Sequence, residues 1–141
     1  MRPREVFLSH ASADRRAAER IVLCLGRHGV KVWYSKSKLR GSQAWQDEIG
    51  KALARCDWLI VLLTPAAVRS EWVKHELAYS LIKKRYRRRI IPAMFKRCRH
   101  QNLSFTLAAM QMVDFRENFR AGLSDLLRVW NIRFKPKIRK F

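Results

Sequence analysis

The residue best suited to chemistry is Glu76, which follows Trp72 by four positions. Residues at this spacing lie on one face of a helix, so the indole and the carboxylate are neighbours. Val73, Leu77 and Leu81 form an apolar row beside them, which puts Glu76 at the margin of a buried face. A carboxylate there is partly desolvated and still reaches a ligand. The spacing also fits an exposed glutamate in a charged helix, so both interpretations stay open.

Short apolar runs that predict strands alternate with amphipathic segments that predict helices. The strands are expected at residues 6–8, 30–34, 58–63, 89–95 and 110–115. Helices are expected after the first, second, third and fifth strands, the later three at about residues 44–56, 70–84 and 119–130. Residues 97–109 show no clear pattern. Ser12 or Asp14 can cap the first helix, which ends at Gly26 or Gly29. Pro92 suggests an edge strand or an irregular strand end.

This alternation predicts an α/β fold, a flavodoxin-like three-layer sandwich. We expect a five-stranded parallel sheet of order 2-1-3-4-5 with helices on both faces. Ligands of such sheets bind beyond the carboxyl ends of the strands, at the switch point between the first and third. The candidates there are residues 9–12, the loop at 35–42 and the start of the helix after Leu63.

The composition predicts one intracellular, cytoplasmic domain. The 141 residues suffice for a single core, and we expect the domain at residues 1–134 and a basic tail or linker at 135–141. Cys24, Cys56 and Cys98 are widely spaced, which favours reduced thiols over disulfides. No metal site is indicated, and no apolar segment is long enough to span a membrane.

The net charge of +20 is concentrated in a few segments of the chain. Residues 78–112 contain no acidic side chain, and the stretch at 83–99 carries nine lysines and arginines. Such a stretch attracts polyanions, so an acidic partner or sequence-independent, salt-sensitive binding of nucleic acid is possible. A solvated basic face is the simpler interpretation.

Three segments together resemble bacterial TIR (Toll/interleukin-1 receptor) domains. They are VFLSHASAD near the N-terminus, the segment from GVKVWYSKSKLRGS to LIVLLTPAAV, and the run from Ser70 to Leu77. That run holds a serine, a tryptophan and a Glu-Leu pair in the order of the family's signature. The resemblance covers the chain from Glu5 to about Trp130.

The resemblance implies that the chain cleaves NAD⁺ between nicotinamide and ribose, with Glu76 as the essential glutamate. NAD⁺ is then a substrate, and no cofactor is expected. Nicotinamide leaves as a neutral molecule, so no acid has to protonate it. The ribose becomes oxocarbenium-like, and one carboxylate can stabilise it. The product is ADP-ribose or a cyclic ADP-ribose.

Binding roles follow from the position of residues at the carboxyl end of the sheet. Ser9, His10, Ala11 and Ser12 can hold the ribose or the phosphates of the ligand. Lys38 can meet the pyrophosphate, although a solvated loop fits it equally well. Trp45 and Trp72 can stack on a ring of the ligand. Trp33 and Trp58, which lie in predicted strands, are expected in the core.

The family also suggests partners. TIR sites become competent when domains assemble, because the loop before residue 44 reaches a neighbouring copy. We therefore expect a homo-oligomer or filament on activation, and a role in bacterial antiphage defence or stress signalling. The alternative is a non-catalytic adaptor that recruits other TIR domains, since a fold does not decide a function.

Overall fold

The computed structural model describes residues 2–36 and 42–136, which form a parallel sheet covered by helices. The strands are β1 (Val6–Ser9), β2 (Val32–Trp33), β3 (Trp58–Leu63), β4 (Ile90–Met94) and β5 (Val113–Asp114). They lie in the order β2-β1-β3-β4-β5, and each neighbouring pair is parallel. The predicted fold class and strand order are confirmed.

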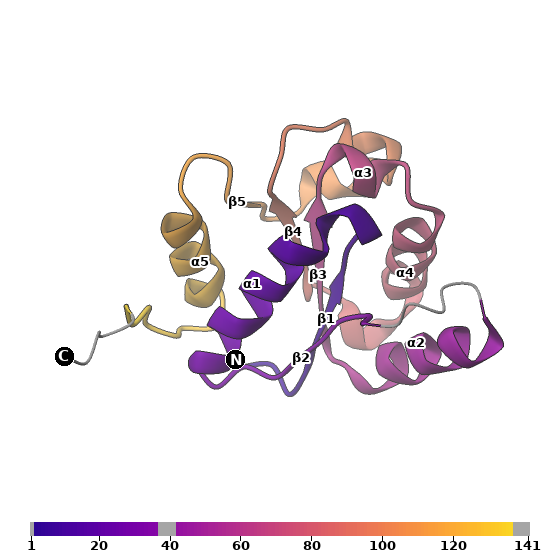
Figure 1. Ribbon diagram of the computed structural model, residues 1–141, viewed down its shortest axis with the longest axis horizontal. Helices are drawn as coiled ribbons and strands as arrows, with labels where there is room; N and C mark the ends of the chain where they lie inside the picture. The colour runs from indigo at the N-terminus through magenta and orange to yellow at the C-terminus, as the bar shows by residue number, and fades with distance from the viewer. Residues whose placement is uncertain (1, 37–41, 137–141) are drawn as a thin grey trace.

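The helices form a layer on each face of the sheet. They are α1 (Arg15–Arg27), α2 (Gln43–Arg55), the short α3 (Pro65–Val68), α4 (Glu71–Ile82) and α5 (Phe119–Arg128). Single turns of 3₁₀ helix lie at η1 (Ser12–Asp14), η2 (Lys84–Tyr86), η3 (His100–Asn102) and η4 (Phe105–Ala109). Figure 1 shows α1 and α5 on one side of the sheet, and α2 and α4 on the other.

The central strand β3 explains why there are two cores. Its side chains alternate between the faces, with Ile60 and Leu62 packing in the core under α1 and α5. Leu59, Val61 and Leu63 pack in the core under α2, α3 and α4. All six residues of β3 are buried, which is why its sequence is continuously apolar instead of alternating.

Pro92 lies in an interior strand, so the expectation of an edge strand was wrong. β4 pairs with β3 along its whole length and with β5 only at Ala93 and Met94. The Phe95 amide donates to β3, and because amides alternate in direction along a strand, the Pro92 nitrogen faces the β5 side. The pairing of β4 with β5 begins only at Ala93, after Pro92. No hydrogen bond between these two strands is therefore lost at Pro92.

Two other local expectations also differ from the structure. Leu81 is 38% exposed, and the small Ser80 is buried in its place. Asp14 does not cap α1 with its side chain. Instead its buried carboxylate accepts a hydrogen bond from Thr64 at the end of β3, which ties the turn after β1 to the neighbouring strand.

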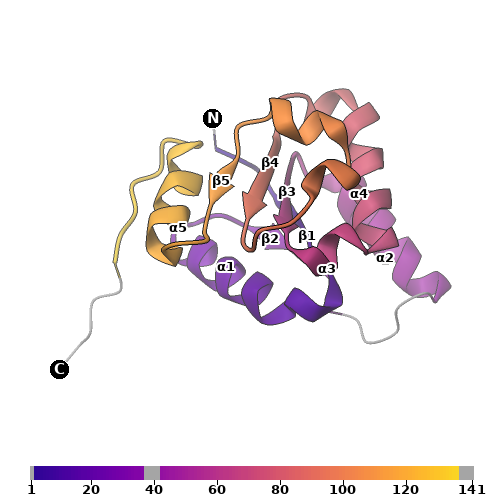
Figure 2. The same cartoon turned by 90° about the horizontal axis from the view of Figure 1, so that it is seen from above.

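The segment between β4 and β5 folds back on the α4 side of the sheet (Figure 2). Its turns η3 and η4 were the part of the sequence without a clear pattern. Leu107 is fully buried against the α4 core, so one apolar side chain anchors the segment there.

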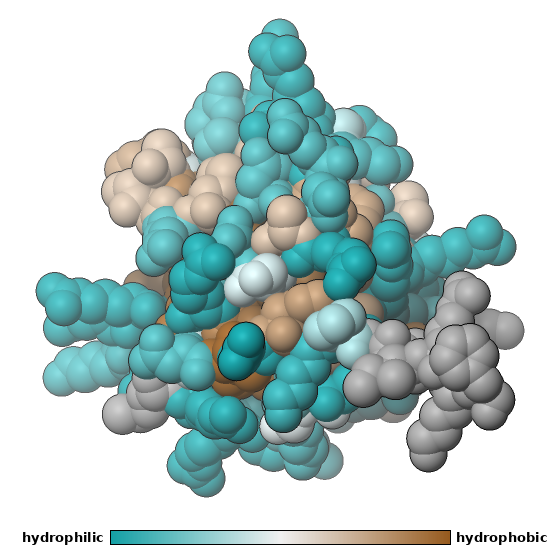
Figure 3. Space-filling model, turned by 90° about the vertical axis from the view of Figure 1, so that its left-hand side faces the viewer, coloured by the Kyte–Doolittle hydropathy of each residue, from teal (hydrophilic) through white to brown (hydrophobic). Residues whose placement is uncertain are grey.

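The surface is strongly polar and basic. Seen from the α5 side, hydrophilic side chains cover most of it, and apolar ones show between them (Figure 3). None of the helices in the described ranges is both long and apolar enough to cross a bilayer.

Candidate functional site

Helix α4 places Glu76 against the sheet. The helix starts at Ser70, whose hydroxyl accepts a hydrogen bond from the Val73 amide at 3.2 Å and caps the first turn. Val73 and Leu77 are buried in the core beneath the helix. Glu76, next to Leu77, is only 6% exposed. The interpretation of Glu76 as an exposed surface glutamate is therefore wrong.

Glu76 and Ser9 meet at the carboxyl end of β1. The Ser9 hydroxyl donates to Glu76 Oε1 at 2.5 Å, a distance typical of a hydroxyl bound to a charged carboxylate. Ser9 is 1% exposed, so the bond lies out of contact with bulk water. A buried carboxylate is costly unless it is hydrogen-bonded, and Ser9 supplies one such bond. The bond also fixes the direction in which the carboxylate points.

His10 lies beside Glu76 on the same hollow in the surface. Its Nδ1 is 2.8 Å from the Ala11 carbonyl oxygen. A carbonyl only accepts, so Nδ1 carries the hydrogen, and in the neutral ring Nε2 is an acceptor. His10 is 6% exposed, and its ring contacts Tyr34 at a centroid distance of 6.1 Å.

Tryptophans form the walls of the hollow. Trp45 from α2 and Trp72 from α4 meet edge to face, with centroids 4.3 Å apart. The indole nitrogen of Trp45 donates to the Ser35 hydroxyl at 2.8 Å, which fixes the ring. The hollow is lined by Leu8, His10, Trp33, Ser35, Trp45, Trp72 and Glu76. Its chemistry is one carboxylate and one imidazole within aromatic walls.

The hollow is narrow. Its volume is about 10 Å³, roughly the room that one water molecule needs. Trp45 is 3% exposed, whereas Trp72 is half-buried. Trp72 is therefore the less enclosed of the two indoles, and any ligand larger than a water molecule needs the walls to separate before it contacts Glu76.

The structure brings together five of the eight residues predicted for the site: Ser9, His10, Trp45, Trp72 and Glu76. Ala11 is buried in the α4 core and takes part through its carbonyl. Ser12 is exposed at the start of η1 and does not line the hollow. Lys38 lies outside the described residues.

Three residues of the hollow, Leu8, Trp33 and Ser35, were not predicted as site residues. Trp33 was expected in the core, but it is half-buried and lines the hollow while stacking on Phe7 at 4.9 Å. Ser35 was included only in a loop range. Trp33 is the last residue of β2 and Ser35 follows it closely. Ligands of α/β sheets bind at the carboxyl ends of strands, so this position could have indicated both residues.

The comparisons with known proteins agree with this fold. A family model described as "TIR domain" matches residues 6–127. The match covers most of the chain, and the chain therefore belongs to the TIR domain family.

One curated relative has a named enzymatic activity. The 2′ cyclic ADP-D-ribose synthase BtTIR of Bacteroides thetaiotaomicron is 30% identical over 74 residues. The match covers 52% of this chain and 26% of the relative. The chain thus spans only about a quarter of the length of the curated relative that it matches.

Solved structures support the fold alone. The TIR domain of the Toll-related receptor TRR-2 from Hydra magnipapillata superposes with a TM-score of 0.64 at 20% identity, covering 88% of each chain. The TIR domains of the activated Roq1 resistosome, which recognises the effector XopQ, give a TM-score of 0.66 at 17% identity. That match covers 89% of this chain and 96% of the other.

Proposed function

We propose that this TIR domain cleaves NAD⁺ at the bond between nicotinamide and ribose, with Glu76 as the catalytic carboxylate. The observation that carries the proposal is the buried Glu76 carboxylate, held by the Ser9 hydroxyl at 2.5 Å beside His10 and a tryptophan wall. The relative named as a cyclic ADP-ribose synthase supports the same chemistry.

The proposed reaction needs few protein groups. Nicotinamide departs without being protonated, and positive charge builds up on the ribose in an oxocarbenium-like transition state. Glu76 stabilises this charge from a fixed position that is shielded from bulk water. His10 Nε2 contacts the ribose hydroxyls, the Ser9 hydroxyl holds Glu76 in position, and Trp72 covers a ring of the ligand. The anomeric carbon of the ribose then bonds to water, to a ribose hydroxyl or to the adenine ring. Attack by water or by a hydroxyl releases one proton; the products are ADP-ribose from water and a cyclic ADP-ribose from the internal groups.

Assembly supplies the opening of the site in this proposal. A hollow of about 10 Å³ does not hold NAD⁺, so the single domain represents a closed state. A second copy binds the open state more tightly than the closed state. The free energy of association therefore shifts the equilibrium between the two states toward the open one. The protein then acts as an effector of bacterial defence or stress signalling, triggered by self-association.

A product analysis tests the proposal. The protein, at a concentration that favours association, is incubated with NAD⁺, and the mixture is separated by chromatography. We expect nicotinamide together with ADP-ribose or a cyclic ADP-ribose in equal molar amounts. NAD⁺ that stays intact at every protein concentration, with and without a crowding agent, contradicts the proposal.

The narrow hollow favours a second candidate, a non-catalytic module that recruits other TIR domains. It predicts stable and specific association with TIR domains and no turnover of NAD⁺ in any assembled state. Light scattering and the product analysis on the same samples separate the two candidates, because only the first links association to nicotinamide release.

A further inference from the structure

A second, larger cavity lies at the end of the sheet opposite Glu76. Its volume is about 500 Å³, within the range of sites that bind small molecules. Trp58 and Ile90, the first residues of β3 and β4, line it. Ser9 lies at the other end of the sheet, where β1 finishes. The cavity is thus separate from the hollow at Glu76.

Arg85 and Arg89 of the basic stretch bind other parts of the protein and do not line the cavity. Arg85 donates from Nη2 to the Leu53 carbonyl at 2.5 Å and from Nε to the Cys56 carbonyl at 3.2 Å. These bonds attach η2 to the end of α2. Arg89 forms an ion pair with Asp57 at 3.8 Å. Both guanidinium groups are therefore already engaged by the protein.

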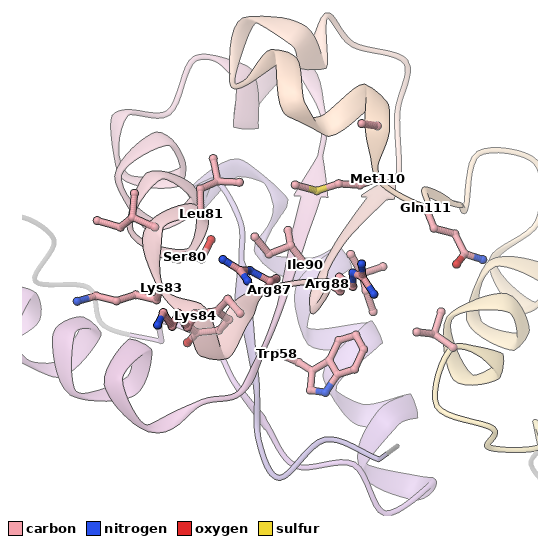
Figure 4. Close-up of a pocket in the computed structure, with 15 residues that line it drawn as sticks. Trp58, Ser80, Leu81, Lys83, Lys84, Arg87, Arg88, Ile90, Met110 and Gln111 are labelled. Atoms are coloured by element: carbon pink, nitrogen blue, oxygen red, sulfur yellow. The ribbon is translucent and has the colours of Figure 1, made fainter.

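Four other cations of the stretch line the cavity: Lys83, Lys84, Arg87 and Arg88. All four are exposed, and among the described residues none of them forms an ion pair. None of the described residues that line the cavity is acidic. Figure 4 shows the two lysines at one rim, Met110 at the other, and the two arginines between them. The cavity therefore concentrates positive charge that the protein leaves unneutralised.

The two arginines occupy the corner of a strained turn. The Arg89 amide donates to the Tyr86 carbonyl at 2.9 Å, Arg87 has φ −59° and ψ 123°, and Arg88 has φ 61°. This is a type II turn, whose third position favours glycine. An arginine there costs of order 1 kcal/mol. The chain thus holds a cation where backbone stability alone favours glycine.

One wall of the cavity is apolar. Ile90 and Met110 line it together with the buried ring of Trp58. Methionine sulfur makes favourable contacts with aromatic rings, often at the ring edge, and arginine guanidinium planes stack on the faces of such rings. A bare inorganic anion leaves this apolar wall without a contact. A flat ring that carries phosphates contacts the apolar wall with its ring and the arginines with its phosphates.

We propose that this cavity binds an organic phosphate of nucleotide size. Arg87 and Arg88 bind its phosphates as paired guanidinium forks, with Lys83 and Lys84 adding charge at the rim. The ring of the ligand lies against Ile90 and Met110. The site is independent of NAD⁺ cleavage at Glu76.

Calorimetric titration with ATP tests the site. We expect one ATP per chain, and binding of adenosine or of tripolyphosphate at least about tenfold weaker than that of ATP. Equal affinity for ATP and tripolyphosphate overturns the proposal, because the apolar wall then contributes nothing. An absence of ATP binding also overturns it.

Substitutions at the two arginines test whether ATP binds in this cavity. Arg88→Gly removes a cation and relieves the turn, so we expect an unchanged or higher melting temperature and about tenfold weaker ATP binding. Arg87→Gln has a similar effect on affinity. The control is Arg97→Gln, which removes the same charge from an exposed position after β4 and should change affinity less than twofold. An equal loss in all three variants indicates diffuse polyanion binding, as for nucleic acid, and overturns the proposal.

Discussion

Ser9 and Glu76 are 67 positions apart in the chain, and a 2.5 Å hydrogen bond joins their side chains in the interior. Ser9 is the last residue of β1, and Glu76 lies on α4, the second helix after β3. The bond thus fixes the proposed catalytic carboxylate relative to the sheet. This contact is the basis of the functional account.

The first prediction concerns Ser9. In Ser9→Ala, the carboxylate of Glu76 loses a hydrogen bond that is buried away from bulk water. A bond to a charged group contributes about 1.5–3 kcal/mol, so we expect the rate of nicotinamide release to fall about 10- to 100-fold. Unfolding in denaturant should show a loss of about 1–3 kcal/mol in stability.

The matched control is Ser124→Ala, at a half-buried position of α5 on the other face of the sheet. It should retain the rate of the original protein. An equal loss of activity in both variants means that the effect of Ser9 is general and contradicts its positioning role.

The second prediction concerns assembly. Because the hollow at Glu76 holds only about 10 Å³, we expect the activity per molecule to rise with protein concentration. The measurement is nicotinamide release across a hundredfold dilution series, with the size of the particles followed by light scattering. A constant activity per molecule across the series contradicts the coupling of assembly to catalysis.

The third prediction tests the packing of α5. A methyl group at Gly122 lies 2.6 Å from the ring of Phe115 and 2.9 Å from the Asp114 carbonyl oxygen. We expect Gly122→Ala to lower the free energy of unfolding by about 1–3 kcal/mol.

Gly50 is the control, because it lies within α2 with open space around it. Gly50→Ala should raise stability by about 0.5–1 kcal/mol, since alanine loses less conformational freedom in a helix. Thermal unfolding of the two variants should therefore shift in opposite directions.

The fourth prediction is a pH dependence of stability. The guanidinium of Arg55 binds both oxygens of the buried Glu5 carboxylate, at 2.7 and 3.1 Å. This bond, with the charge of Lys31, lowers the pKa of Glu5 below its ordinary value of 4.5. A lowered pKa stabilises the folded state at pH values above 4.5, and this contribution is lost as the pH falls through the folded-state value.

Denaturant unfolding of the original protein and of Glu5→Gln checks this prediction. The difference in stability between them should be full at pH 7 and should shrink as the pH is lowered below about 4.5. A difference for Glu5→Gln that is constant with pH contradicts the assignment.

Local patterns were enough to predict the frame of the site. Apolar runs of strand length and their alternation with helices predicted the parallel sheet, because each parallel connection needs a crossover. The strand order came from choosing the flavodoxin-like arrangement of such sheets. Helical spacing put Glu76 beside Trp72 at the edge of a buried face. These features depend on neighbours within a few positions, which a sequence displays directly.

Features that depend on distant neighbours were not predictable. Pro92 correctly indicated a special position, but only the late start of β5 explains why an interior strand tolerates it. Trp33 looked like a core residue because the sequence does not show that its strand ends at the hollow. Arg85 was one cation in a basic run, and its bonds to the end of α2 arise from tertiary packing alone.

The most direct test of the account compares Glu76→Gln with Glu71→Gln. Both variants remove one carboxylate from α4, but Glu71 is exposed in the first turn, whereas Glu76 is buried at the hollow. Nicotinamide release is measured by chromatography at equal concentrations of assembled protein. The account predicts no detectable release from Glu76→Gln and a rate within about twofold of the original for Glu71→Gln. Full activity in a folded Glu76→Gln protein contradicts it.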